Sequence, residues 1–442
     1  MAGIPLIRHN DPAGTFAWRG GQPVTVAHFL RDVEQLAAGL PARSHILNLC
    51  TDRYRFAVGF AAALLRGQTS LLPPNYTADF VARLGRRYPD LYCLTDGATE
   101  LSGIEIVPFP ASFEGAAPDD IPQIDEQQQA ALVFTSGSTG DPVAHAKSWG
   151  SLCRGAVGEA ERLGIVQDSG MAVLGTVPAQ HMYGLESSML LAMQNGLALV
   201  AERPFYPADI CARLAALPRS RCMITTPVHL RTLLAEVGQV PPVDFVLCAT
   251  APLAPQLAAE AEARFGAPLY EIYGCTEAGM VASRRTTQGA AWHLLPGVTM
   301  EQDEQGTRVR GGHVEIEAPL SDVIERNPDG TFILHGRTAD MVNIAGKRTS
   351  LASLNHHLNS IAGVQDGVFL MPDDGDAAVT RPLAFVVAPG LGAQQILDAL
   401  RNSMDAVFLP RPLYLVEALP RNSTGKLTRE SLLRLREQCA KR

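Results

Sequence analysis

The sequence predicts an α/β protein, with a large layered α/β N-terminal domain and a small α+β C-terminal domain on a hinge. Short apolar runs alternate with helical patterns through the middle of the chain, which is typical of packed layers of strands and helices. After Gly336 the pattern changes to three apolar runs with two or three helices between and around them. The 442 residues also exceed the usual length of one domain. We therefore expect a large domain over 1–337 and a small mobile domain over 338–442.

The composition is that of a globular chain with an acidic balance. Hydrophobic residues make up 46% and charged residues 19%, which is enough apolar material for a large core. The net charge of −8 argues against nucleic acid or an anionic membrane as the main partner. The start of the chain has no basic and apolar leader, and the apolar run at 56–65 is too short to span a bilayer. We expect a cytoplasmic protein without membrane insertion.

The large domain is predicted from alternating strands and helices. Its strands are expected at 131–134, 171–178, 197–202, 221–227, 244–250 and 268–274. Apolar residues at three- and four-residue spacing predict helices at 188–196, 208–217, 228–237 and 254–266. Such folds bind ligands at the carboxyl ends of their strands, so polar residues that follow a strand are the candidate site. The eight cysteines form no CxxC pair, which predicts buried thiols rather than zinc ligands or disulfides.

A run of small polar residues follows the strand at 131–134. The run TSGSTG comprises Thr135, Ser136, Gly137, Ser138, Thr139 and Gly140. Backbone N–H groups and short hydroxyl donors of this kind suit a phosphate. The run is not a Walker loop, because Asp141 and Ala146 stand where that pattern requires glycine. A mobile Ser/Gly linker would have the same composition, so the run alone does not establish a phosphate site.

The motif YGCTE follows the strand at 268–274. Tyr273 offers an aromatic face that can stack on a base, and Gly274 can turn the chain. Thr276 can bond a phosphate oxygen, and Glu277 can hold the Mg²⁺ that accompanies a triphosphate. Taken alone, the same residues also fit a strand turn with a carboxylate at a helix N-terminus.

Two further motifs lie toward the end of the chain. Asp322 precedes the turn pair at 329–330, where a carboxylate can accept both ribose hydroxyls, and Arg337 can pair with an anion or with the ribose. Near the C-terminus, LPRNSTGKLTRE repeats a Ser-Thr-Gly turn and adds Lys426. Taken alone, the first motif is a hairpin with surface charges and the second is a solvated lysine.

In this order the motifs resemble those of the acyl-adenylate-forming superfamily, which includes acyl-CoA and aryl-CoA synthetases, peptide-synthetase adenylation domains and luciferases. TSGSTGDP resembles its phosphate loop, YGCTE its adenine and magnesium motif, GRTADMVNIAGKR its hinge and PRNSTGK its C-terminal lysine motif. PAQHMYG resembles its acyl-pocket motif, which implies acyl binding by His181, Met182 and Tyr183. The resemblance extends from about residue 20 to the end of the chain.

The resemblance implies a ligase that uses ATP and Mg²⁺. A small aryl or fatty carboxylic acid would attack the α-phosphate to give acyl-AMP and pyrophosphate, and a thiol would then displace AMP. Thr276, Glu277 and Lys426 would be catalytic, with Glu277 also the metal ligand and Lys426 stabilising charge in the first step only. The residues implied to contact ATP are those of the TSGSTG run with Ala249, Thr250, Tyr273, Gly274, Asp322 and Arg337.

Three positions depart from the family pattern. Val143 stands where a lysine commonly follows the loop proline, and whether Lys147 reaches back to replace it is left open. Ala339 replaces the usual hinge side chain next to Asp340, and Thr250 stands in what is usually a Gly-rich turn, where it would narrow the acyl pocket. The altered loop and hinge support an alternative, a catalytically silent sensor or scaffold that binds acyl-adenylate or AMP. The carboxylates and the lysine of the other motifs argue against it.

The charge distribution favours an acyl carrier protein over free coenzyme A as the acceptor. The residues from 338 to 442 include 12 Lys or Arg and 10 Asp or Glu, whereas the whole chain is at −8. Carrier proteins are usually acidic, so a basic small domain would attract one. Coenzyme A remains the alternative acceptor, because its phosphates could bind the same arginines. About 130 residues precede the phosphate loop, as in compact ligases that load carrier proteins.

Overall fold

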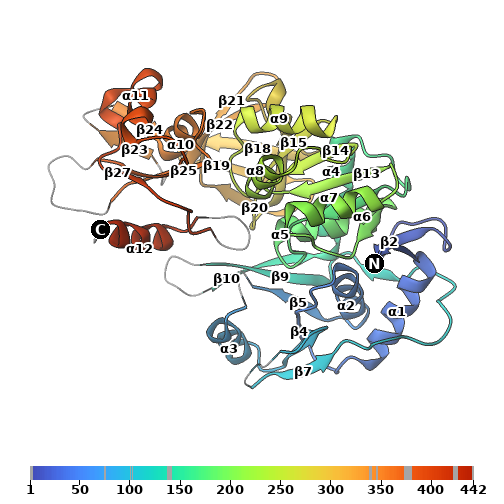
Figure 1. The fold of residues 1–442 in the computed structure, drawn as a ribbon. Helices are drawn as coiled ribbons and strands as arrows, with labels where there is room; N and C mark the ends of the chain where they lie inside the picture. The colour runs from blue at the N-terminus through green and yellow to red at the C-terminus, as the bar shows by residue number, and fades with distance from the viewer. Residues whose placement is uncertain are drawn as a thin grey trace.

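The structure is a computed structural model that describes most of the chain. The described residues are 3–73, 76–99, 101, 103–136, 142–337, 341–344, 347–372, 381–421 and 427–440. Figure 1 shows two strand-and-helix layers that meet near the middle of the molecule, with the C-terminal elements on one side of them. The predicted α/β fold with a smaller C-terminal α+β domain is therefore confirmed.

The larger sheet has the strand order β17-β16-β15-β14-β13-β11-β12-β2-β3. Its strands are β2 (Thr15–Arg19), β3 (Gln22–Thr25), β11 (Ala172–Gly175), β12 (Ala198–Val200), β13 (Arg221–Thr225), β14 (Phe245–Cys248), β15 (Leu269–Cys275), β16 (Gly279–Arg284) and β17 (His293–Leu294). The central strands from β2 to β15 pair in parallel, and β3, β16 and β17 add antiparallel edges. The carboxyl ends of the central strands consequently lie at one edge of the sheet, as a ligand site of this fold class requires.

The second sheet has the order β10-β9-β5-β4-β6-β7. Its strands are β4 (His45–Asn48), β5 (Thr69–Leu72), β6 (Leu91–Thr95), β7 (Glu105–Pro108), β9 (Gln129–Ser136) and β10 (Pro142–Ser148). A short pair, β1 (Gly3–Pro5) with β8 (Gln123–Asp125), lies outside both sheets. All neighbours in the second sheet are parallel except β10, which returns antiparallel to β9. The predicted phosphate loop connects these two strands.

Helices cover both sheets and begin and end at residues that the sequence marks. They are α1 (Val26–Gly39), α2 (Arg53–Leu65), α3 (Ala78–Arg87), α4 (Trp149–Leu163), α5 (Met182–Gly184), the π-helix η1 (Leu185–Leu190), α6 (Leu191–Asn195), α7 (Pro207–Ala216), α8 (Pro227–Glu236), α9 (Pro255–Phe265) and the 3₁₀ turn η2 (Thr286–Gln288). Proline opens α7, α8 and α9, where its missing N–H costs nothing. In Figure 1 these three helices lie over β13, β14 and β15.

Smaller sheets connect the large domain to the C-terminal one. They are β18 (Val298–Asp303), β19 (Gly306–Gly311) and β20 (Val314–Leu320), followed by the hairpin β21 (Asp322–Arg326) and β22 (Phe332–Arg337). The C-terminal elements are β23 (Met341–Ile344), β24 (Lys347–Ser350), α10 (Leu351–Asn359), β25 (Asp366–Leu370), β26 (Leu383–Val387), α11 (Ala393–Ser403), η4 (Ala406–Phe408), β27 (Leu413–Leu415) and α12 (Arg429–Ala440).

The hydrophobic cores of the described residues divide at the same place as the elements. Two clusters are built only from residues after 341, and the others only from residues before 337. The boundary at 337 itself remains a prediction, because 338–340 lie outside the described residues. Five of the eight cysteines are buried. In the part of the chain that the structure describes, no helix is both long and apolar enough to cross a membrane.

Candidate active site

Thr135 lies near the end of β9, where the predicted phosphate loop begins. Pairing of Pro142 with Ser136 brings the two ends of that loop together. The loop residues Gly137, Ser138, Thr139 and Gly140 and the side chain of Ser136 lie outside the described part of the structure, so their phosphate contacts remain predictions. The Thr135 Oγ1 atom lies 3.0 Å from Nε2 of His145, which is on β10.

The YGCTE motif forms a hairpin between β15 and β16. Gly274 must be a glycine because a Cβ there would lie 2.3 Å from the carbonyl oxygen of Gly279. Gly279 has a φ of +79°, a conformation that glycine adopts without strain. The two glycines let the strands approach closely and place Thr276 and Glu277 in the connecting turn. The Glu277 side chain is 39% exposed, so a ligand can reach its carboxylate.

Tyr273 and Asp322 are joined directly. The Tyr273 hydroxyl donates a hydrogen bond of 2.6 Å to the Asp322 carboxylate, which begins β21. The ring of Tyr273 packs against Trp292 and Phe332, with centroid distances of 5.8 Å and 5.9 Å. The structure thus brings the predicted base-stacking residue and the predicted ribose carboxylate together. Arg337 pairs with Asp322 in the β21–β22 register, but its side chain is outside the described set.

Two basic residues of β10 lie against Glu277. The His145 Nε2 atom is 3.7 Å from Oε1 of Glu277, and the Lys147 ammonium donates a 2.6 Å hydrogen bond to the Glu277 carbonyl oxygen. The sequence leaves open whether Lys147 replaces the missing loop lysine, and in the structure its ammonium contacts the YGCTE turn. His145 was not predicted as a site residue. The signal that could have identified both is their two-residue spacing, which places them on one face of a strand.

Buried titratable groups surround the Lys147 ammonium. Burial lowers the pKa of Lys147, while the neighbouring carboxylates, Glu186 foremost, act in the opposite direction. Burial raises the pKa of Glu186 to about 7, and the Met280 N–H, which donates to its carboxylate, opposes this rise. His313 is also buried, and its pKa falls to about 4 because of desolvation and the Lys147 charge. These groups lie beneath the hairpin rather than at its exposed tip.

The loop after β14 contains an unusual backbone conformation. Thr250 has a φ of +83°, which is rare for a residue branched at Cβ. Residues held in such regions concentrate at ligand sites, where the surrounding structure maintains the strain. Ala249 next to it is buried and follows the last residue of β14. The adenine contacts implied for these two residues remain predictions.

The predicted acyl-binding residues begin the helical segment from 182 onward. The Tyr183 hydroxyl points to the carbonyl oxygens of Thr225 and Leu247, at 3.1 Å and 3.0 Å. These carbonyls lie at the carboxyl ends of β13 and β14, so the Tyr183 side chain crosses the candidate edge of the larger sheet. Burial raises the pKa of Tyr183 well above its usual value. His181 and Met182 are half-buried beside it, and acyl binding by the three residues stays a prediction.

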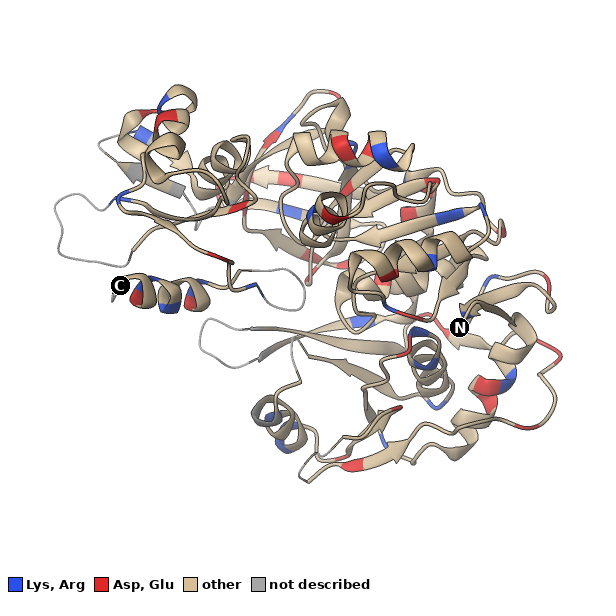
Figure 2. Cartoon of the chain, in the orientation of Figure 1, with Lys and Arg blue, Asp and Glu red and all other residues tan. Residues whose placement is uncertain are grey.

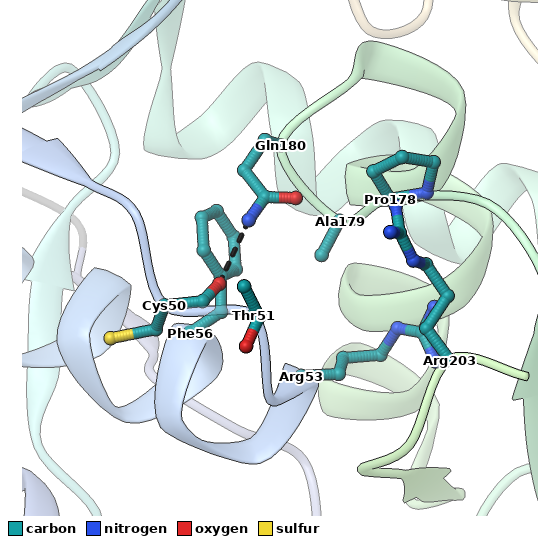
Figure 3. Close-up of a pocket in the computed structure, with 8 residues that line it drawn as sticks. All are labelled: Cys50, Thr51, Arg53, Phe56, Pro178, Ala179, Gln180 and Arg203. Carbon is teal, nitrogen blue, oxygen red and sulfur yellow. Dashed lines mark hydrogen bonds between the residues drawn. The ribbon is translucent and has the colours of Figure 1, made fainter. Parts of the chain in front are cut away.

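A small polar cavity lies behind the same segment (Figure 3). It has a volume of about 50 Å³ and is lined by Cys50, Thr51, Arg53, Phe56, Pro178, Ala179, Gln180 and Arg203. The buried Arg53 guanidinium donates to the carbonyls of Gly175, Val177 and Val200. Gln180 donates to the Cys50 carbonyl, as the dashed line in Figure 3 marks. The cavity was not predicted, and Arg53 chiefly joins the ends of β11 and β12.

The remaining predicted residues lie outside the described part of the chain. They are Lys426 of the C-terminal motif and Ala339 and Asp340 of the hinge. Arg421, the last described residue before the Lys426 loop, pairs with Asp366 through two hydrogen bonds of 2.8 Å. Asp366 also lies 3.3 Å from Arg231 on α8, which is an ion pair between the two domains.

Comparison with known proteins gives one family match and many relatives. The model of the family described as AMP-binding enzyme matches residues 8–336. A 4-coumarate–CoA ligase of Rhodobacter capsulatus is 30% identical over 304 residues, which cover 68% of this chain and 75% of the relative. A 2-succinylbenzoate–CoA ligase of Staphylococcus epidermidis is 23% identical and covers 69% of both chains.

Solved structures show the same fold over nearly the whole chain. The o-succinylbenzoate CoA synthetase of Bacillus subtilis, in complex with its acyl-adenylate intermediate, superposes with a TM-score of 0.83 at 20% identity. The superposition covers 98% of each chain. At this identity the likeness supports the fold alone.

Proposed function

Because this chain belongs to the family of AMP-binding enzymes, we propose that it is an AMP-forming ligase that joins a small carboxylic acid to a thiol. A carboxylate oxygen forms a bond to the α-phosphorus of ATP, and pyrophosphate leaves. The thiol sulfur then bonds to the acyl carbon, AMP leaves and the thiol proton passes to solvent. The relatives in the comparison are CoA ligases by name, which supports this class of reaction.

The observation that supports the proposal most is the position of His145. Its Nε2 atom lies 3.0 Å from Oγ1 of Thr135, just before the phosphate loop, and 3.7 Å from Oε1 of Glu277, the proposed metal ligand. The start of the phosphate loop and the Glu277 carboxylate therefore lie close together. The Tyr273–Asp322 hydrogen bond joins β21 to β15, the strand that leads into the Glu277 turn, and the nucleoside would be held there. Residues predicted separately for phosphate, metal and nucleoside thus border one region.

The site fits a magnesium ion that arrives with ATP. Glu277 offers one accessible carboxylate, and Mg²⁺ in nucleotide enzymes usually takes one or two carboxylates with phosphates and water. Among the described residues, no three His, Cys, Asp or Glu side chains gather as a metal site. When bound, the ion neutralises charge on the phosphates. Thr276 would orient a phosphate oxygen, Asp322 the ribose, and Lys426 would stabilise the charge that develops at the α-phosphate.

The proposed acceptor is the phosphopantetheine arm of an acyl carrier protein, with coenzyme A as the alternative. Support for the carrier comes from the small domain, where α12 contains Arg429, Arg434 and Arg436 against two glutamates. Figure 2 shows both signs of charge on this helix, so the attraction would come from a modest excess rather than a uniform basic face. The names of the relatives support coenzyme A.

The test is acid-dependent exchange of pyrophosphate into ATP, measured over a library of aryl and fatty acids. We expect exchange with at least one acid class, and thioester formation when a thiol is added. The silent sensor alternative predicts nucleotide binding without exchange for every acid. Transfer to coenzyme A and to a carrier protein is then compared at low and high salt, with Arg434→Glu and Arg436→Glu variants. A rate of transfer to the carrier protein that changes neither with salt nor in the two variants would contradict the carrier proposal.

A further inference from the structure

The strand β10 presents two basic side chains to one acidic residue of the other sheet. His145 and Lys147 are two positions apart, so they share a face of the strand. His145 lies beside the Glu277 carboxylate and Lys147 bonds the Glu277 carbonyl. Both contacts run from the six-stranded sheet to the hairpin of the nine-stranded sheet. The same strand therefore bonds the backbone of Glu277 through Lys147 and places His145 next to its carboxylate.

The Lys147 contact is made by a buried ammonium. Lys147 is 5% exposed, and taking an ammonium out of water costs several kcal/mol unless partners compensate. An apolar side chain at this position would fill the same space without that cost. The partners present are the Glu277 carbonyl oxygen at 2.6 Å and the nearby charge of Glu186. The contacts of the Lys147 ammonium with the Glu277 carbonyl oxygen and with Glu186 therefore explain why a lysine is buried at this position.

Glu186 contacts the same hairpin at the start of β16. Its carboxylate lies against Gly279, where an added Cβ would come within 2.5 Å of Oε1. It accepts a hydrogen bond from the Met280 N–H, on the β16 side of the same turn. Lys147 thus holds the turn at Glu277 and Glu186 holds it three residues later. The Lys147 ammonium and the Glu186 carboxyl thus contact the two sides of the hairpin, with the turn between them.

We infer that Lys147 and His145 are positioning residues that fix the Glu277 carboxylate for the metal ion accompanying ATP. Lys147 sets the backbone position of Glu277, and His145 sets the direction of its carboxylate relative to Thr135. The inference rests on the proposed function of Glu277 as a metal ligand. It also gives Lys147 a role other than that of the lysine missing after the loop proline, since its ammonium lies against the metal motif.

The test measures metal binding without catalysis. Mn²⁺ serves as the probe, and its electron paramagnetic resonance signal is titrated with protein and a non-hydrolysable ATP analogue. Lys147→Met keeps the side-chain volume and removes the charge, and we expect the Mn²⁺ dissociation constant to rise roughly tenfold, as is usual when a partner of a metal ligand is lost. Binding of the analogue without any divalent metal should stay within about twofold of the unaltered chain, because the inference gives neither positioning residue a contact with the nucleotide.

Two further variants make the test specific. His145→Gln, at a partly exposed position, should raise the Mn²⁺ dissociation constant in the same direction, and it tests the inference even if Lys147→Met does not fold. Arg264→Met is the matched control, because that guanidinium also donates to backbone carbonyls, those of Leu234 and Val237, away from the hairpin. It should lower the melting temperature while leaving Mn²⁺ binding unchanged.

The outcomes separate this inference from the proposed function. Unchanged Mn²⁺ affinity in folded Lys147→Met and His145→Gln would overturn the inference, as would an equal loss of metal-free nucleotide binding, which indicates direct contact with phosphates. Failure of acid-dependent exchange with normal Mn²⁺ binding in the unaltered chain would overturn only the proposed function. Absence of Mn²⁺ binding in the unaltered nucleotide complex would overturn both.

Discussion

At the scale of single residues, Glu277 combines an exposed carboxylate with a backbone carbonyl that accepts a hydrogen bond from Lys147. We predict that Glu277→Gln reduces Mg²⁺-dependent ATP–pyrophosphate exchange by roughly tenfold or more, because a neutral amide is a poor ligand for a hard cation. The fold should persist, since the side chain is 39% exposed and the substitution keeps its shape. Exchange rates at several Mg²⁺ concentrations and melting temperatures measure the two effects. An unchanged rate at low Mg²⁺ would contradict the assignment.

Glu159 gives a prediction about stability and pH. It is a buried carboxyl on α4, and burial, reinforced by Glu186, raises its pKa from 4.5 to about 8. The folded state therefore holds a proton that the unfolded state releases, so this contribution to stability is complete below pH 4.5 and is lost as the pH rises through about 8. Glu159→Gln stays neutral, so urea unfolding from pH 5.5 to 8 should show a smaller fall in stability. An identical slope in both proteins would show that Glu159 does not carry this dependence.

At the scale of elements, the loop after β14 contains strain that a glycine would relieve. Thr250 has a φ of +83°, and such a conformation costs a Cβ-branched residue about 1–2 kcal/mol. We predict that Thr250→Gly leaves the free energy of unfolding unchanged or raises it by about 1 kcal/mol. Thr299→Gly, at an exposed position of β18, is the control and should lower it by about 0.5–1 kcal/mol. Urea titration measures both, and equal losses would mean that Thr250 is not strained.

At the scale of the whole molecule, an ion triad joins the two domains. Asp366 on β25 accepts from Arg421, next to the Lys426 loop, and lies 3.3 Å from Arg231 on α8. We predict that Asp366→Asn slows adenylate formation roughly tenfold, because the triad joins α8 to Arg421, which leads into the loop of Lys426, the residue proposed to act in that step. Thioester formation from supplied acyl-AMP should change less than twofold.

The two half-reactions are measured separately to check this prediction. Asp405→Asn is the control, because Asp405 pairs with the exposed Lys347 inside the small domain and should affect neither half-reaction. An equal fall of both half-reactions in Asp366→Asn would show that the triad stabilises the small domain without selecting its orientation. A fall confined to thioester formation would assign the triad to the second step.

The sequence by itself determined the layers and the positions of the motifs. Apolar periodicity predicted β13, β14 and the helices from α7 to α9, because this signal comes from local side-chain spacing. It also placed Glu277 in a turn after a strand, since the glycines around it are local signals. The roles of these residues still rest on resemblance, and Lys426 and the hinge lie outside the described chain.

Only the tertiary structure decided which of these side chains meet. Nothing local in the sequence indicates that Tyr273 bonds Asp322, that His145 lies between Thr135 and Glu277, or that Arg231 crosses to Asp366. The sequence left open whether Lys147 reaches the phosphate loop, whereas the packing of one sheet against the other places its ammonium against the Glu277 carbonyl. The physical reason is that local periodicity fixes the face on which a residue lies, while the packing of distant elements fixes what that face contacts.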